Sequence, residues 1–232
     1  MPHRRITRED NFIWLLGALV FLLFSGAVVG QYQWESGQRV VSLTLLVTLV
    51  TNIWALDRGK SRWVGWKIGA SVFIGALLLG DLYLEHHLMS LAQLCTVLAF
   101  LCFTIYQAGN QVLFTGDIDG NKIVGAICVY FLLGLVWAFA YLLAEELYPG
   151  SLHGLADSGW RHNMQSATYY SFVTLTTLGY GDLTPAQPIA RFLAYMEAVV
   201  SIFYTTILVA SLIGIRLSGW DASKPAEEQE SK

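Results

Sequence analysis

The chain has 232 residues, of which 55% are hydrophobic and only 13% are charged. Soluble domains carry about twice that charged fraction, so the composition excludes an ordinary soluble protein and indicates one that lies in a membrane. The net charge of −3 comes mostly from the acidic residues of a polar C-terminal tail, and no feature of the sequence suggests binding to nucleic acid.

Apolar runs of membrane-spanning length recur along the chain. A helix needs about 20 apolar residues to cross a bilayer, and the runs near that length are 11–30, 40–56, 63–84, 86–106, 123–147 and 189–217. A further run, 163–176, is too short to cross. It is predicted to be a re-entrant helix, which a membrane tolerates only where protein or a water-filled pore surrounds it. The sequence therefore predicts an all-α membrane protein with six transmembrane helices and one re-entrant helix.

Positive charge predicts the orientation of these helices, because cytoplasmic loops are enriched in Lys and Arg. Of the 14 basic residues, only Arg39, Arg161 and Arg191 fall on one side of the predicted topology. The others lie in the segment 1–10, around the loops that follow the second and fourth spans, and after the last span. We therefore expect both termini in the cytoplasm.

Four polar residues crowd the predicted outer loop between the third and fourth spans: Asp81, Glu85, His86 and His87. On a continuous helix Asp81 and Glu85 would share a face, because they are four residues apart. A metal or proton site is one interpretation and a solvated loop is the other, which the sequence favours. A membrane enzyme built on these residues is the least favoured function, and the chain is not expected to be an enzyme.

Residues 176–182 read T-T-L-G-Y-G-D, between the re-entrant run and the last span. Four copies of such a segment around an axis can point backbone carbonyls inward at successive levels, where the oxygens replace the hydration shell of an ion. Aiming consecutive carbonyls the same way needs dihedrals that glycine tolerates, and Gly179 and Gly181 stand where such a wall needs them. A simple turn between two helices is the alternative, since Gly and Asp are common turn residues.

The string resembles the selectivity filter of tetrameric potassium channels. The resemblance runs over about 123–217 and includes V-T-L-T-T-L-G-Y-G-D-L-T-P at 173–185 and Arg191 at the start of the next helix. It implies that Asp182 lies at the outer mouth of the filter and that Thr177 adds its hydroxyl oxygen as an innermost ring. The implied filter residues, of which the first four bind K+, are Thr177, Leu178, Gly179, Tyr180 and Gly181.

The resemblance also implies roles for residues around the filter. Glu197 is the one acid inside the last span, and we expect it to form a hydrogen bond behind the filter or to the fifth helix. Ser201 stands where many relatives place a hinge glycine. The other residues expected to support the filter are Tyr169, Tyr170, Thr174 and Thr176. The residues expected at the inner cavity and gate are Ser201, Ile202, Thr205, Val209, Ile213 and Gly214.

The chain departs from this family at several places. Val173 stands where some relatives carry a glutamate that pairs with the aspartate of the outer mouth, and Leu178 replaces the commoner valine. The run 86–106 has no Arg or Lys, although six-helix relatives usually carry a row of them there. Moving one charge through 100 mV is worth about 2.3 kcal/mol, so steep voltage gating needs several such residues. We therefore expect opening to be independent of voltage.

The expected domain organisation follows from these assignments. A four-helix, sensor-like domain without gating charges precedes a pore domain that contains the outer helix, pore helix, filter and inner helix. The expected segments are 1–10 (cytoplasmic N-terminus), 11–107 (sensor-like domain), 108–122 (cytoplasmic linker), 123–217 (pore domain) and 218–232 (short cytoplasmic tail).

The sequence thus predicts a potassium-selective channel of the prokaryotic six-helix type in a plasma membrane, in a bacterium its inner membrane. Because each chain supplies one filter strand, three further copies are needed to complete a homotetrameric pore in the lipid bilayer. No cofactor is expected other than K+ ions in the filter. A weakly selective cation channel is one alternative. A potassium-uptake transporter subunit is another, from a class whose chains hold four pore repeats.

Overall fold

The computed structural model describes residues 11–32, 65, 69, 87–114, 120–156 and 158–221. Its helices are α1 (Asn11–Tyr32), α4 (His87–Phe114), α5 (Gly120–Leu147), α6 (Trp160–Leu175) and α7 (Pro188–Asp221). Two short strands, β1 (Leu152–His153) and β2 (Thr184–Pro185), pair antiparallel on either side of α6 in the sequence.

Four of the described helices are long and apolar enough to cross a membrane: Phe12–Gln31, His87–Val112, Asn121–Leu147 and Pro188–Leu208. They correspond to the first, fourth, fifth and sixth expected spans, so the prediction of a multi-pass, helical membrane protein is confirmed at this level. The expected span 40–56 and all but two residues of 63–84 lie outside the described residues.

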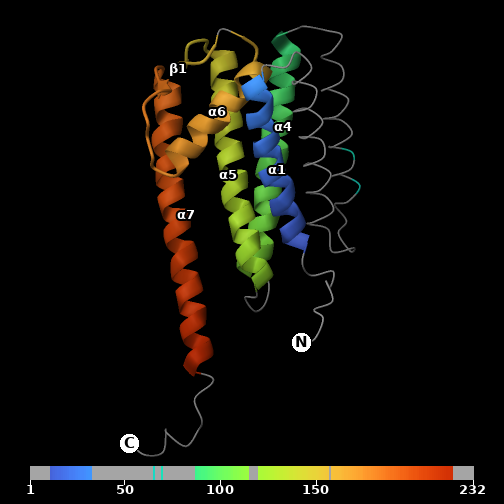
Figure 1. Ribbon diagram of the computed structural model, residues 1–232, viewed down its shortest axis with the longest axis vertical. Helices are drawn as coiled ribbons and strands as arrows, with labels where there is room; N and C mark the ends of the chain where they lie inside the picture. Colours follow the sequence, from blue (N-terminus) through green and yellow to red (C-terminus); the bar gives the residue numbers. More distant parts are fainter. Residues whose placement is uncertain are drawn as a thin grey trace, which may run out of the picture.

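The helices α1 and α4 both pack against α5, and α7 stands on the opposite side of α5 (Figure 1). α5 is apolar around its whole circumference, which is typical of a helix buried among others, and it contacts α1, α4, α6 and α7. Fully buried leucines from three helices, Leu15, Leu94 and Leu132, lie in the main core. The start of α1 and the end of α7 lie at the same end of the molecule (Figure 1).

The short helix α6 runs obliquely from the other end of the molecule, between α5 and α7 (Figure 1). It approaches α5 closely at Gly134, where a Cβ atom would stand 2.7 Å from the ring of Phe172. It also contacts α1, where a Cβ atom on Gly26 would stand 2.7 Å from the side-chain oxygen of Gln165. Glycine at these two positions therefore lets α5 and α1 pack directly against α6.

The helix α6 begins at Trp160, before the expected start at residue 163. Asn163 explains the difference, because its side-chain amide donates hydrogen bonds to the carbonyl oxygens of Ala156 (2.9 Å) and Ser158 (3.0 Å). These bonds fold the preceding loop back against the helix. Trp160 is buried and packs on the ring of Phe139, so the first turn is fixed by tertiary contact.

The connection between α4 and α5 is shorter than the 108–122 linker expected from sequence. α4 continues to Phe114 and α5 begins at Gly120. No proline stands between residue 106 and Phe114 to end the helix, and Ala108 is fully buried in the main core. Tertiary packing therefore extends α4 beyond the apolar run that the sequence shows.

Candidate functional site

The segment predicted to form the filter lies in the loop between α6 and α7. Every residue of 176–182 is exposed in the single chain, whereas Ser171, Val173 and Leu175 just before it are buried. The loop thus lies on the surface while the helix that leads into it is held in the interior.

The turn that leaves α6 is closed by backbone hydrogen bonds. The amide of Thr176 donates to the carbonyl of Phe172 (3.0 Å), that of Thr177 to Thr174 (2.9 Å), and that of Leu178 to Val173 (2.9 Å). The last carbonyl groups of a helix have no partner within the helix. Here the following residues supply partners for three of them, so the loop 176–182 is anchored at its inner end.

The backbone of the loop has positive φ at every second residue. The values are 60° at Thr177, 58° at Gly179 and 80° at Gly181, while Leu178 and Tyr180 are not in this region. Glycine was expected to be needed at two of these positions, but the third was not foreseen. Thr177 is β-branched, and such a residue at positive φ is an outlier that costs about 1–3 kcal/mol and is typical of functional sites.

The second half of the loop contacts the aromatic side chain of Tyr169 on α6. The ring of Tyr180 stacks on that of Tyr169, with centroids 6.5 Å apart and planes 13° apart. The Tyr169 hydroxyl lies beside Asp182 and lowers the pKa of that carboxyl below its usual value. Backbone amides add to this effect and desolvation opposes it. Tyr169 therefore favours the ionised form of Asp182.

The other residues expected to support the filter differ in their environments. Tyr170 is buried, and its ring meets that of Tyr141 edge-on with centroids 4.8 Å apart. Thr174 is half-buried and its carbonyl accepts the amide of Thr177. The hydroxyl of Thr176, just after α6, donates to the carbonyl of Phe172 in that helix at 2.6 Å.

Glu197 is fully buried at the junction of three helices. Its carboxyl oxygens lie 2.6 Å from the hydroxyl of Tyr141 on α5 and 2.6 Å from the hydroxyl of Ser171 on α6. Ser171 also lies 2.7 Å from the carbonyl oxygen of Gly134. Glu197 of α7 therefore contacts both α5 and α6.

The residues expected at the inner cavity and gate separate into different environments on α7. Ser201 is buried, at 2% exposure, whereas Ile202 and Thr205 are exposed in the single chain. The hydroxyl of Thr205 bonds within its own helix, to the carbonyls of Ser201 and Ile202. α7 continues through the remaining expected positions, Val209, Ile213 and Gly214.

The loop between α5 and α6 is tied to the segment that follows residues 176–182. Leu152 pairs with Pro185, and His153 with Thr184. The carboxylate of Glu145 accepts the amides of Gly150 (2.7 Å) and Leu152 (3.0 Å), which fixes the start of this loop. This two-residue ladder could not be predicted from sequence, because it joins short segments that lie far apart in the chain.

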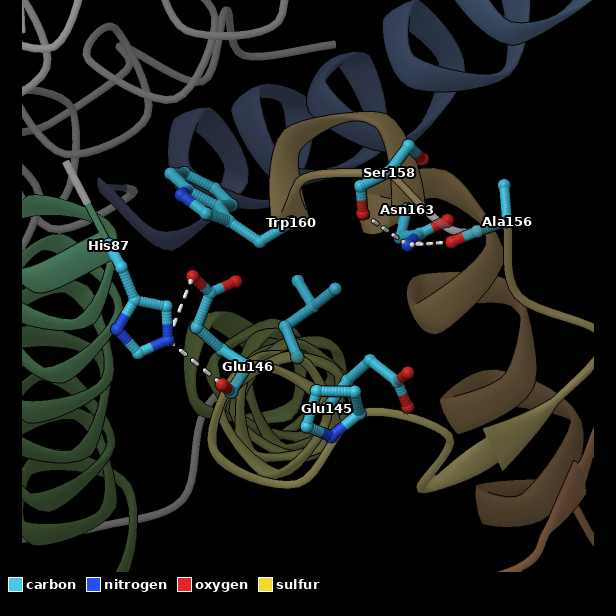
Figure 2. Close-up of a pocket in the computed structure, with 9 residues that line it drawn as sticks. His87, Glu145, Glu146, Ala156, Ser158, Trp160 and Asn163 are labelled. Atoms are coloured by element: carbon cyan, nitrogen blue, oxygen red, sulfur yellow. Dashed lines mark hydrogen bonds and ion pairs between the residues drawn. The ribbon is translucent and has the colours of Figure 1, made fainter. Parts of the chain in front are cut away.

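A cavity of about 180 Å³ opens where α4 and α6 begin and α5 ends. Figure 2 shows His87 directed toward Glu146, with its Nε2 atom 3.1 Å from the backbone oxygen and 3.7 Å from the side-chain Oε1. Of the polar cluster considered for a metal or proton site, only His87 lies in the described part of the chain. Among the described residues no group of three or more His, Cys, Asp or Glu could hold a metal ion. His87 therefore links α4 to α5.

The part of the chain that contains α6 and the loop 176–182 is similar to a known protein family. Residues 125–216 match the family model described as "Ion channel". Two pore potassium channel c of Oryza sativa subsp. japonica is 30% identical over 80 residues, which are 34% of this chain and 18% of the rice protein. The chain thus matches less than a fifth of that relative's length. No solved structure matches the chain significantly.

The matched segment runs from α5 through α6 and the loop 176–182 into α7. It includes both the positive-φ residues and the buried contacts of Glu197. Residues 125–216 are therefore similar to an ion channel domain, and the described part of the chain contains four helices that could cross a membrane. The match indicates a channel rather than an enzyme.

Proposed function

We propose that the chain is a potassium-selective channel whose filter is residues 177–181. The observation that carries the proposal is the alternation of φ within residues 176–182, where φ is positive at Thr177, Gly179 and Gly181 and not at the residues between them. Alternating backbone handedness turns successive peptide groups to the same side. Carbonyl oxygens arranged in this way can replace the hydration shell of K+. The proposed ion ligands are the carbonyls of Thr177, Leu178, Gly179 and Tyr180, with Asp182 at the outer mouth.

A homotetramer is proposed because the single chain leaves this loop uncovered. Residues 176–182 are all exposed, and polar backbone groups without partners cost several kcal/mol each in lipid. α7 beside the loop also carries exposed large apolar side chains. These are Ile189, Phe192, Tyr195, Val199, Ile202, Phe203 and Ile207. Four chains around one axis would cover the loop and place α7 around an inner cavity.

We propose that the filter faces outward and that both termini are cytoplasmic, in a plasma membrane or bacterial inner membrane. The start of α1 and the end of α7 lie at one end of the molecule, and α6 enters from the other (Figure 1). Voltage is proposed to have little effect on opening. The helix α4 contains no Arg or Lys, and a charge must move through the field for voltage to act.

Recordings from purified chain in planar bilayers test this function. With potassium on both sides, replacing it by sodium on one side should move the reversal potential strongly toward that expected for a potassium electrode. The conductance should change little with voltage. Equal permeability to the two ions would instead support the weakly selective alternative. Absence of passive current, with uptake that needs an energy source, would support a transporter subunit.

Removing the hydroxyl next to Asp182 should change how external acid reduces the current. In Tyr169→Phe the largest of the causes that lower the pKa of Asp182 is lost, so the carboxylate is protonated at a higher external pH. Its attraction for cations is then lost earlier, and the midpoint of the acid block moves to higher pH. Tyr148→Phe is the control, because Tyr148 is an exposed loop residue. Identical midpoints in all three proteins would contradict the role of Tyr169.

A further inference from the structure

The fourth terminal carbonyl of α6 differs from the other three in its partners. The carbonyls of Phe172, Val173 and Thr174 accept amides of the residues that follow the helix. The carbonyl of Leu175 instead accepts hydroxyls from two other helices. Ser201 of α7 donates to it, and Tyr130 of α5 donates to it at 3.2 Å. We call this contact the Leu175 junction.

Both lone pairs of the Leu175 carbonyl oxygen accept a hydrogen bond in the Leu175 junction. A carbonyl oxygen has two lone pairs and each hydroxyl has one proton to donate. Ser201 and Tyr130 each supply one, and their oxygens lie 3.4 Å apart, so both converge on the same acceptor. Ser201 is 2% exposed, and a buried polar group of this kind is costly when it loses its partner.

The position of Tyr130 is itself fixed. Its ring stacks on that of Tyr204 with centroids 6.0 Å apart and planes 25° apart. The hydroxyl of Tyr204 donates to the carbonyl of Ala126 on α5 at 2.6 Å. The Leu175 junction is therefore part of a polar and aromatic contact that runs along α5 and α7, and it does not depend on a mobile side chain.

We infer, on the basis of the proposed potassium-channel function, that Ser201 and Tyr130 are positioning residues for the ion selectivity of the filter, acting through the carbonyl of Leu175. Leu175 is the last residue of α6, and Thr177 with its positive φ follows two residues later. The Leu175 junction fixes where the filter segment starts. It holds the strained backbone of Thr177 at the level where the innermost ion ligands lie.

This assignment changes the role expected of Ser201. From sequence, Ser201 was expected among the cavity and gate residues, because many relatives carry a hinge glycine at that position. Its hydroxyl instead joins α7 to the pore helix, so a bend of α7 at this point would break the Leu175 junction. Its contribution is therefore to the geometry of the filter, and α7 and α6 move together at this level.

Two single substitutions remove the junction hydroxyls with little change in packing, Ser201→Ala and Tyr130→Phe. Each should lower the potassium-to-sodium permeability ratio by about two- to tenfold, the factor that one net hydrogen bond is worth. The double variant should lose little more than the larger single loss, because both hydroxyls serve one acceptor. Thr168→Val is the matched control, since that buried hydroxyl donates only within α6, to Met164 at 2.7 Å.

The permeability ratio is measured from reversal potentials of purified channels in planar bilayers. A reversal potential does not change when fewer channels are folded, so a loss of stability alone leaves this ratio unchanged. A lower ratio in both variants and an unchanged ratio in Thr168→Val supports the inference. Ratios equal to that of the parent chain in Ser201→Ala and Tyr130→Phe would overturn it while leaving the proposed function intact. A parent chain that is not potassium-selective would remove the proposed function itself.

Discussion

Replacement of Gly179 or Gly181 by valine is expected to abolish potassium flux without preventing insertion of the chain into a membrane. Both residues have φ in the left-handed region, at 58° and 80°. A side chain there costs about 1–2 kcal/mol per residue, and it would cost about 4–8 kcal/mol when repeated in four subunits. Within the single chain no atom lies within 4 Å of a Cβ at either position, so the cost within each subunit comes from the backbone.

The matched control is Gly159→Val. Gly159 precedes α6 in the same domain, has an ordinary φ of −57°, and likewise has open space around a Cβ. Flux is measured as potassium-driven uptake of a tracer cation into liposomes, and insertion by protease protection. The control should conduct like the parent chain. Selective flux retained in Gly179→Val and Gly181→Val would show that residues 177–181 are not the filter.

The loop 176–182 could be predicted because its chemistry is local. Two glycines at alternate positions, a threonine before them and an aspartate after them stand together in the sequence. The anchoring of the loop could not be predicted in the same way. The partners of Leu175 and Glu197 are brought together by the packing of α5, α6 and α7. Only the burial of an acid in an apolar helix indicated that Glu197 would have a partner.

The positive φ at Thr177 could not be predicted from the sequence for a different reason. Threonine does not signal positive φ, as glycine does, and the conformation arises from the hydrogen bonds on either side of it. The boundaries of α4 and α6 were misjudged because tertiary contacts, at Ala108 and Trp160, extend both helices. Local pattern therefore gave the kinds of element, and packing decided their ends.

The contacts of Glu197 lead to a prediction about its protonation. Ser171 lies at hydrogen-bond distance from both the Gly134 carbonyl (2.7 Å) and a carboxyl oxygen of Glu197 (2.6 Å). Its hydroxyl has one proton, and the Gly134 carbonyl can only accept. Both contacts are hydrogen bonds when Glu197 is a neutral acid: its carboxyl proton is donated to Ser171, and the Ser171 hydroxyl donates to the Gly134 carbonyl. A neutral acid also avoids the cost of a charge buried inside the membrane.

Glu197→Gln is therefore expected to conduct like the parent chain. The NH2 group of the glutamine can donate to Ser171, and its oxygen can accept from Tyr141. Both hydrogen bonds of the Glu197 side chain are therefore kept. Glu197→Ala leaves the buried hydroxyl of Tyr141 without its acceptor and opens a cavity. It should lower the free energy of unfolding by about 2–4 kcal/mol.

The two variants are compared with the parent chain by denaturant unfolding in detergent and by flux in liposomes. A glutamine variant near the parent and an alanine variant that unfolds at lower denaturant would mean that hydrogen bonding at Glu197 holds α5, α6 and α7 together. If Glu197→Gln were as unstable as Glu197→Ala, the site would need a carboxylate. The hydroxyl of Ser171 would then donate its proton to the carboxylate of Glu197, and the Gly134 carbonyl would accept no hydrogen bond from Ser171.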